Sequence, residues 1–98
     1  MLQVKCSRIV FSGHALRRMF QRGLGKDDIV EVLYAGECIA EYPDDRPYSS
    51  SLILGFLGTR PVHVVVAKDP EGDACYVVTA YVPDSSLWSD DFRTRRAP

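Results

Sequence analysis

The sequence predicts an α+β fold in which two N-terminal helices pack on one face of a four-stranded antiparallel sheet. Helical apolar periodicity is confined to residues 13–35, and β-prone segments fill residues 38–82. Tight turns join these segments and no helix separates them, which favours antiparallel neighbours over a βαβ arrangement. We therefore expect residues 1–98 to form one domain whose last part, 85–98, is partly irregular.

The first helix is predicted to start near Gly13, because Ser12 is a suitable N-cap. The segment before it, 4–11, fits either a first strand or an irregular lead-in. Apolar side chains at helical spacing give this helix a face that we expect to be buried. That face consists of Ala15, Leu16, Met19 and Phe20.

The second helix is predicted over residues 26–35, with Asp27 and Asp28 in its first turn, where carboxylates favour the helix dipole. Gly58-Thr59 is a hairpin signal, and residues 69–73 form a second turn. The predicted strands are 38–42, 51–57, 60–68 and 75–82. Beyond them we expect one helical turn and a frayed end, anchored by Trp88 and Phe92.

Composition indicates a chain of the globular class, with 46% hydrophobic and 26% charged residues. No apolar run approaches the roughly 20 residues of a membrane span, and the N-terminus lacks the apolar stretch of a signal peptide. The three cysteines, Cys6, Cys38 and Cys75, are far apart and odd in number. We therefore expect a cytoplasmic protein with free, core-filling thiols and neither a disulfide framework nor a zinc site.

Charge is strongly segregated, although the net charge is only −1. Residues 1–26 carry six basic and no acidic side chains, and residues 27–45 carry seven acidic and no basic ones. Arg93, Arg95 and Arg96 make the C-terminus basic again. Because the second helix is acidic, a helix-turn-helix that inserts it into DNA is rejected. Local potential is thus more informative here than the sum.

Two segments, FSGHALRRM at 11–19 and QRGL at 21–24, resemble the opening of the DUF4258 domain family. The resemblance continues through YPDD at 42–45, RPVHVV at 60–65, TAYVP at 79–83 and the terminal Trp88. It implies a RelE-like fold, because the family is grouped with RelE/ParE-like toxins and small α+β ribonucleases. It further implies a toxin of the toxin-antitoxin type that cleaves RNA phosphodiesters without a metal. The implied partner is a small zinc-ribbon protein that looks like an antitoxin.

Metal-free RNA cleavage needs a base, an acid and a fixed cation. His14, Arg18 and Arg22 are spaced four apart, so they form one stripe beside the apolar face of the first helix. One interpretation is a phosphate-binding row in which His14 carries the proton. The other is a structural row in which the arginines pair with the acidic segment, Asp44-Asp45 being the first candidate.

Two residues of the strands complete the candidate site. His63 alternates with the valines of its strand, so it is expected on the face that the helices leave open. It is there either a catalytic or binding group or a half-buried histidine with satisfied hydrogen bonds. Tyr81 ends the last strand, where RelE-like toxins tend to place an aromatic or acidic residue, and its alternative role is a hydrogen-bonding plug at the sheet edge. The predicted catalytic residues are His14, Arg18, His63 and Tyr81. The predicted substrate-binding residues are Arg22, Arg60, Arg93 and Arg95, for which a solvated tail is the alternative at 93–95; no metal ligands and no cofactor are expected.

A second hypothesis is a non-catalytic binding module. Its segregated charge would dock the zinc-ribbon partner or a second copy of the chain, giving a monomer or weak homodimer. Convergence of His14, Arg18, Arg22, His63 and Tyr81 around an open cleft would favour the enzyme. Scattering of these residues, or neutralisation of the arginines, would favour the binding module.

Overall fold

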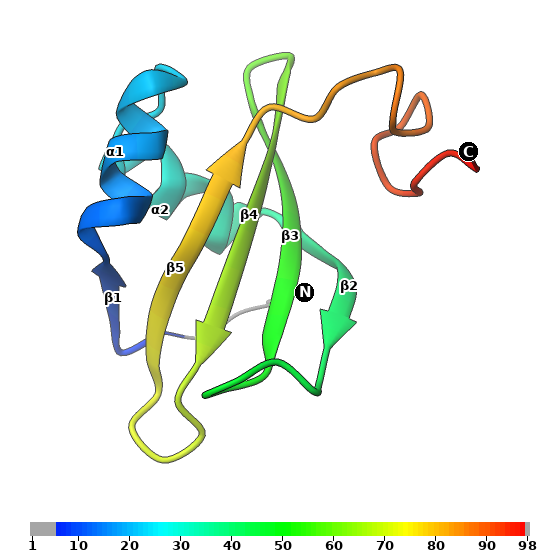
Figure 1. Ribbon diagram of the computed structural model, residues 1–98. Coiled ribbons are helices and arrows are strands. Elements are labelled where there is room, and N and C mark those ends of the chain that lie inside the picture. Colours follow the sequence, from blue (N-terminus) through cyan, green and yellow to red (C-terminus); the bar gives the residue numbers. More distant parts are fainter. Residues whose placement is uncertain (1–5, 98) are drawn as a thin grey trace.

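The computed structural model describes residues 6–97 (Figure 1). Its elements in chain order are β1 (Arg8–Phe11), α1 (Gly13–Gln21), α2 (Lys26–Ala35), β2 (Glu37–Tyr42), β3 (Ser50–Leu57), β4 (Arg60–Lys68) and β5 (Ala74–Tyr81). The strands form one sheet in the order β1-β5-β4-β3-β2. The α+β class is as predicted, and both helices and the hairpin at Gly58 lie where the sequence places them.

The prediction of a four-stranded antiparallel sheet is wrong, because the sheet has five strands and is mixed. β1 pairs in parallel with β5, with Arg8 opposite Ala74 and Phe11 opposite Val77. The remaining pairs are antiparallel. β1 has only four residues, and its partner β5 lies more than sixty residues away in the sequence. Because no short turn joins the two strands, the sequence could not show whether the lead-in at 4–11 is a strand.

Both helices cover the same face of the sheet, α1 over β5 and α2 over β3 and β4 (Figure 1). Ser12 caps α1 by accepting a hydrogen bond from the Ala15 amide at 3.0 Å. Gly55 lets α2 approach closely, since a Cβ there would lie 2.8 Å from Val32 Cγ1. The core formed on this face includes Met19, Ile29, Val32, Leu33, Ile53, Val62, Val64, Val66 and Val77.

One residue of the predicted buried face of α1 lies outside the core. Phe20 is 85% exposed, whereas Ala15 and Met19 are fully buried and Leu16 is half-buried. The helix has only nine residues and lies over the β1–β5 margin of the sheet, so it buries a narrow stripe at i and i+4. Phe20 is therefore an exposed aromatic residue on a basic helix.

The opposite face of the sheet is covered at its two ends by irregular chain. Loop 43–49, whose Arg46–Pro47 peptide is cis, folds across one end. At the other end residues 84–97 form a compact segment, in which Ser89 donates to the Thr94 carbonyl and Arg96 to the Leu87 carbonyl. Trp88 and Arg95 pair across this segment. The described part of this segment is thus folded and not frayed, with Trp88 and Phe92 half-buried as expected, while Arg93, Arg95 and Arg96 are exposed.

The expectation of three free thiols is also wrong. Cys6 and Cys75 form a disulfide with a Cα–Cα distance of 5.5 Å, and Cys38 is the free, half-buried thiol. The bond ties the chain just before β1 to the start of β5, as the parallel pairing of these strands allows. The sequence separation of 69 residues hid this partnership. In residues 6–97 neither helix is long and apolar enough to cross a membrane.

Candidate functional site

A buried histidine and a tyrosine meet where β4 and β5 lie side by side. His63 and Tyr81 are directly opposite each other in the ladder, and Tyr81 Oη lies 3.3 Å from His63 Nδ1. His63 Nε2 lies 2.9 Å from the Phe92 carbonyl oxygen, and the Trp88 ring packs edge-on at 4.4 Å between ring centres. His63 is therefore on the predicted face of the sheet, but the segment 84–97 covers it completely.

These contacts define one protonation arrangement for the pair. Burial lowers the pKa of His63, and the hydrogen bond to the Phe92 carbonyl opposes this in part. A neutral imidazole with its proton on Nε2 donates to Phe92 and leaves Nδ1 to accept from the Tyr81 hydroxyl. Burial and the neighbouring Tyr42 raise the pKa of Tyr81, while Arg95 and Arg22 lower it. Tyr81 is thus a half-buried hydroxyl donor with a buried base behind it.

Arg22, at the end of α1, lies next to this pair, and Arg60, at the start of β4, contacts Arg22. Arg22 Nη1 donates to the Ala80 carbonyl at 2.8 Å and lies 3.4 Å from Thr79 Oγ1. Arg60 Nη2 donates in turn to the Arg22 carbonyl at 3.0 Å. Gly23, with a φ of +69°, ends α1 directly after Arg22 and so fixes where this carbonyl points.

We call Arg22, Arg60, His63 and Tyr81 the β5 cluster. Arg95 lies beside it, with its guanidinium 5.8 Å from the centre of the Trp88 ring. In the described part of the chain, Arg22, Arg60 and Arg95 form no ion pair with a carboxylate. The N–H groups that Arg22 and Arg60 do not donate to Thr79, Ala80 and the Arg22 carbonyl are available to an external anion. Guanidinium can bind two phosphate oxygens at a time.

The other predicted residues lie away from the cluster or are already paired. His14 and Arg18 are exposed, and their side chains make no hydrogen bond or ion pair within residues 6–97. His14 is eight residues from Arg22, about 12 Å along a helix axis. Arg93 pairs with Glu37 and Asp91, and the hydrogen bond that it donates to the Glu37 carboxylate raises the pKa of Arg93.

Of His14, Arg18 and Arg22, which were expected to act as one row, only Arg22 contacts the sheet. The proposed pairing of the arginines with Asp44 or Asp45 is not found in the described structure. Asp45 instead accepts a hydrogen bond from Ser50. Among the described residues, no group of three or more histidine, cysteine or acidic side chains is placed to hold a metal ion.

The residues that enclose His63 had no predicted role in the site. Trp88 supplies a ring against the imidazole and Phe92 supplies a carbonyl, at a backbone φ of +62°. Two aromatic residues in an otherwise polar segment were a sign that it folds back onto apolar surface. Nothing in the sequence indicated that it would fold onto His63.

Comparison with protein-family models gives a match over residues 11–82 to the domain of unknown function DUF4258. The match covers most of the chain and includes every residue of the β5 cluster. The chain therefore belongs to the DUF4258 family. No curated protein and no solved structure matches the chain.

Proposed function

We propose that this member of the DUF4258 family is a toxin of the toxin-antitoxin type that acts as a metal-independent endoribonuclease of the RelE-like class. The observation that carries the proposal is that Arg22, Arg60, His63 and Tyr81, from the end of α1 and from β4 and β5, lie together in the β5 cluster. Of the five residues whose convergence was expected to favour the enzyme, Arg22, His63 and Tyr81 meet, whereas His14 and Arg18 lie away from them. Geometry ranks above pKa in judging such a site. The cluster supplies a proton carrier, a base behind it and unpaired cations.

The buried histidine acts through the tyrosine, because no substrate atom can reach His63. The 2′-hydroxyl proton of RNA passes to Tyr81 Oη while the Tyr81 proton passes to His63 Nδ1. The O2′–P bond forms, the P–O5′ bond breaks, and the leaving 5′-oxygen takes a proton from water. The hydroxide that remains is neutralised by the proton that His63 returns through Tyr81. The products are a 2′,3′-cyclic phosphate and a 5′-hydroxyl. This relay needs a neutral imidazole, as the lowered pKa of His63 provides, and no free tyrosinate.

The arginines have a separate task, since charge accumulates on the phosphorus oxygens as O2′ attacks. Fixed guanidinium groups stabilise that charge without reorganising. Arg22 is held by two groups of β5 and Arg60 by Arg22, so both are pre-positioned. Arg95 is oriented by the Trp88 ring.

The test is cleavage of a defined RNA by the purified protein in excess chelator, with mass spectrometry of the product ends. We expect cyclic phosphates from the wild type. Tyr81→Phe, which removes only the hydroxyl, should lower the rate at least about 100-fold. The matched pair Arg95→Ala and Arg96→Ala should differ, because Arg96 is already paired with Asp90. His14→Ala should keep activity.

Cleavage that is unchanged in Tyr81→Phe would assign the reaction to other residues and overturn this mechanism. Normal growth and intact RNA in a bacterial host that expresses soluble protein without a partner would overturn the toxin assignment. A rate abolished by chelator would overturn the metal-independent chemistry.

A protein-binding module is the second candidate, and exposed Phe20 favours it. This ring is 85% exposed on a helix that carries Arg17 and Arg18 and no acidic residue. An acidic or mixed partner, such as a zinc-ribbon protein or a second copy of the chain, would cover both ring and charge. Co-expression should give a stoichiometric complex that Phe20→Ser weakens. Sedimentation as a monomer in the presence of the co-expressed zinc-ribbon protein would reject this candidate.

A further inference from the structure

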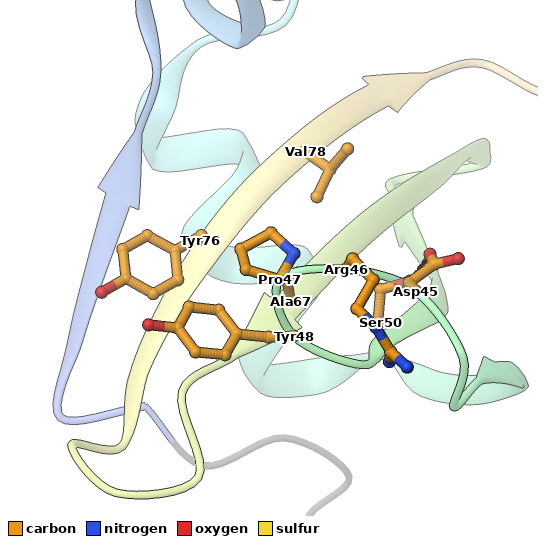
Figure 2. Close-up of a pocket in the computed structure, with 8 residues that line it drawn as sticks. All are labelled: Asp45, Arg46, Pro47, Tyr48, Ser50, Ala67, Tyr76 and Val78. Carbon is orange, nitrogen blue, oxygen red and sulfur yellow. Dashed lines mark hydrogen bonds between the residues drawn. The ribbon is translucent and has the colours of Figure 1, made fainter.

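The face of the sheet opposite the helices has a hollow that lies away from the β5 cluster. It is a cavity of about 430 Å³ where loop 43–49 folds over β4 and β5 (Figure 2). Its floor is apolar, formed by Ala67 of β4 and Val78 of β5, with Pro47 of the loop beside them. Val78 is 47% exposed, so this floor is uncovered.

The wall of the hollow is a pair of aromatic rings. Tyr48 of the loop and Tyr76 of β5 lie nearly parallel, with an interplanar angle of 13° and 5.7 Å between ring centres. Figure 2 shows both hydroxyl groups pointing the same way, with Val78 farther along β5. Both tyrosines are half-buried, so each ring keeps surface free for a flat ligand.

Charge is arranged differently on the two sides of the hollow. Asp69 and Glu71, in the turn after β4, lie close enough to Tyr48 to raise its pKa, Asp69 most strongly. Arg46, on the other side, is exposed and extends away from the rings (Figure 2). In residues 6–97 it forms no ion pair and makes one hydrogen bond, to the Asp44 carbonyl at 3.5 Å. An anionic group is thus repelled at the tyrosine hydroxyls. On the other side Arg46 is the cation available to it, and the neighbouring carboxylate of Asp45 accepts a hydrogen bond from Ser50.

The hollow and the β5 cluster lie on one continuous face. Tyr76 and Tyr81 lie opposite Ala67 and His63, which are four residues apart on β4, and a bulge in the pairing puts the two tyrosines on the same face. They are five residues apart on β5, at most about 17 Å along a strand. Tyr42 lies on the same face, is 39% exposed and is near enough to Tyr81 to influence its pKa. A few nucleotides of an extended single strand would cover this distance.

We propose that the hollow walled by Tyr48 and Tyr76 binds a nucleobase of the single-stranded RNA whose phosphate lies at the β5 cluster. Bases of single-stranded RNA stack on exposed aromatic rings, and their backbone follows arginines. The apolar floor and the two tyrosine rings suit a flat heterocycle, and Arg46 at one side suits the phosphate attached to it. This inference rests on the proposed function for the identity of the ligand.

The test is the affinity of a fluorescent 2′-O-methyl RNA octamer, which binds but cannot be cleaved, and of an abasic octamer with the same backbone. Wild type should prefer the octamer with bases. Tyr48→Ala should bind it roughly 5- to 100-fold more weakly, and Tyr48→Phe within about twofold of wild type, because stacking needs the ring and not the hydroxyl. Both variants should bind the abasic octamer as the wild type does.

A measurement on wild type alone covers the case in which Tyr48→Ala misfolds. An octamer with one photoreactive 4-thiouridine should crosslink to Tyr48 or Tyr76, as mapped by peptide mass spectrometry. Crosslinks elsewhere, equal affinity for the two octamers, or equal weakening of both by Tyr48→Ala would overturn the base site. If binding depends on the bases but natural RNA is not cleaved, the ribonuclease is refuted and the base site is kept. If RNA is cleaved but binding does not change in Tyr48→Ala, the base site is refuted and the ribonuclease is kept.

Discussion

The two ends of β5 are held in place by different means. At its C-terminal end, Arg22 bonds the Ala80 carbonyl, His63 bonds Tyr81, and segment 84–97 covers the histidine. At its N-terminal end, Cys75 is joined covalently to Cys6, and the neighbouring Tyr76 faces an open hollow. The groups able to transfer protons are therefore at the end secured by hydrogen bonds, and the open aromatic surface is at the cross-linked end.

The largest expected effect is at the cross-linked end. Reduction of the disulfide, or Cys6→Ser, should lower the free energy of unfolding by about 4 kcal/mol, because the bond closes a loop of 69 residues. Denaturant titration with and without reductant measures this. Cys38→Ser is the matched control and should not change the response to reductant. Thiol counting on denatured, unreduced protein should find one free cysteine; three would contradict the cross-link and restore the expectation from sequence.

The next largest effect is expected at the C-terminal end of β5, where His63 contacts Tyr81. His63→Ala should lower stability by about 3 kcal/mol, since it leaves a cavity and removes the partner of both the Tyr81 hydroxyl and the Phe92 carbonyl. Tyr48→Ala removes a larger ring from the open end, but it should cost less than about 1 kcal/mol because the ring is only half-buried. Equal losses in the two variants would show that the ends do not differ in packing.

The local features of the fold could be predicted from the sequence. Ser12 as a cap, the Gly58 turn and the face of His63 follow from nearest neighbours and strand alternation. Each of these signals acts over a few residues, and the structure has all of them.

The features that fix the two ends are long-range and were missed. The pairing of β1 with β5, the Cys6–Cys75 bond and the cover of His63 by Phe92 join segments 29 to 69 residues apart. The candidate site was predicted in part for the same reason. Arg22, Arg60, His63 and Tyr81 meet because of how α1, β4 and β5 pack, whereas the periodicity of α1 alone grouped Arg22 with His14 and Arg18.

Protonation should affect one end of β5 through His63. Burial lowers the pKa of His63 in the folded protein, so below the ordinary value of about 6.5 the unfolded chain binds more protons than the folded one. The histidine's contribution to stability is then fully present above pH 6.5 and is lost as pH falls toward the lowered folded pKa. For one proton the slope cannot exceed about 1.4 kcal/mol per pH unit.

Denaturant titrations between pH 7.5 and about 5 measure this slope. His63→Gln should remove part of it, and His14→Gln, on the exposed side of α1, is the matched control. A slope that persists in His63→Gln would assign the titration to other groups and reject a pH-sensitive contact between His63 of β4 and segment 84–97.

The smallest effect distinguishes the two faces of the sheet near the hollow. Val78→Thr keeps the side-chain shape and adds a hydroxyl that reaches solvent, because Val78 is 47% exposed, so stability should change by less than about 0.5 kcal/mol. The same change at Val64, which is fully buried under the helices, should cost about 1–3 kcal/mol because the hydroxyl has no partner. Thermal unfolding of the two variants measures the difference. A large loss at Val78 would mean that the floor of the hollow is packed against other groups, and a base could not lie there.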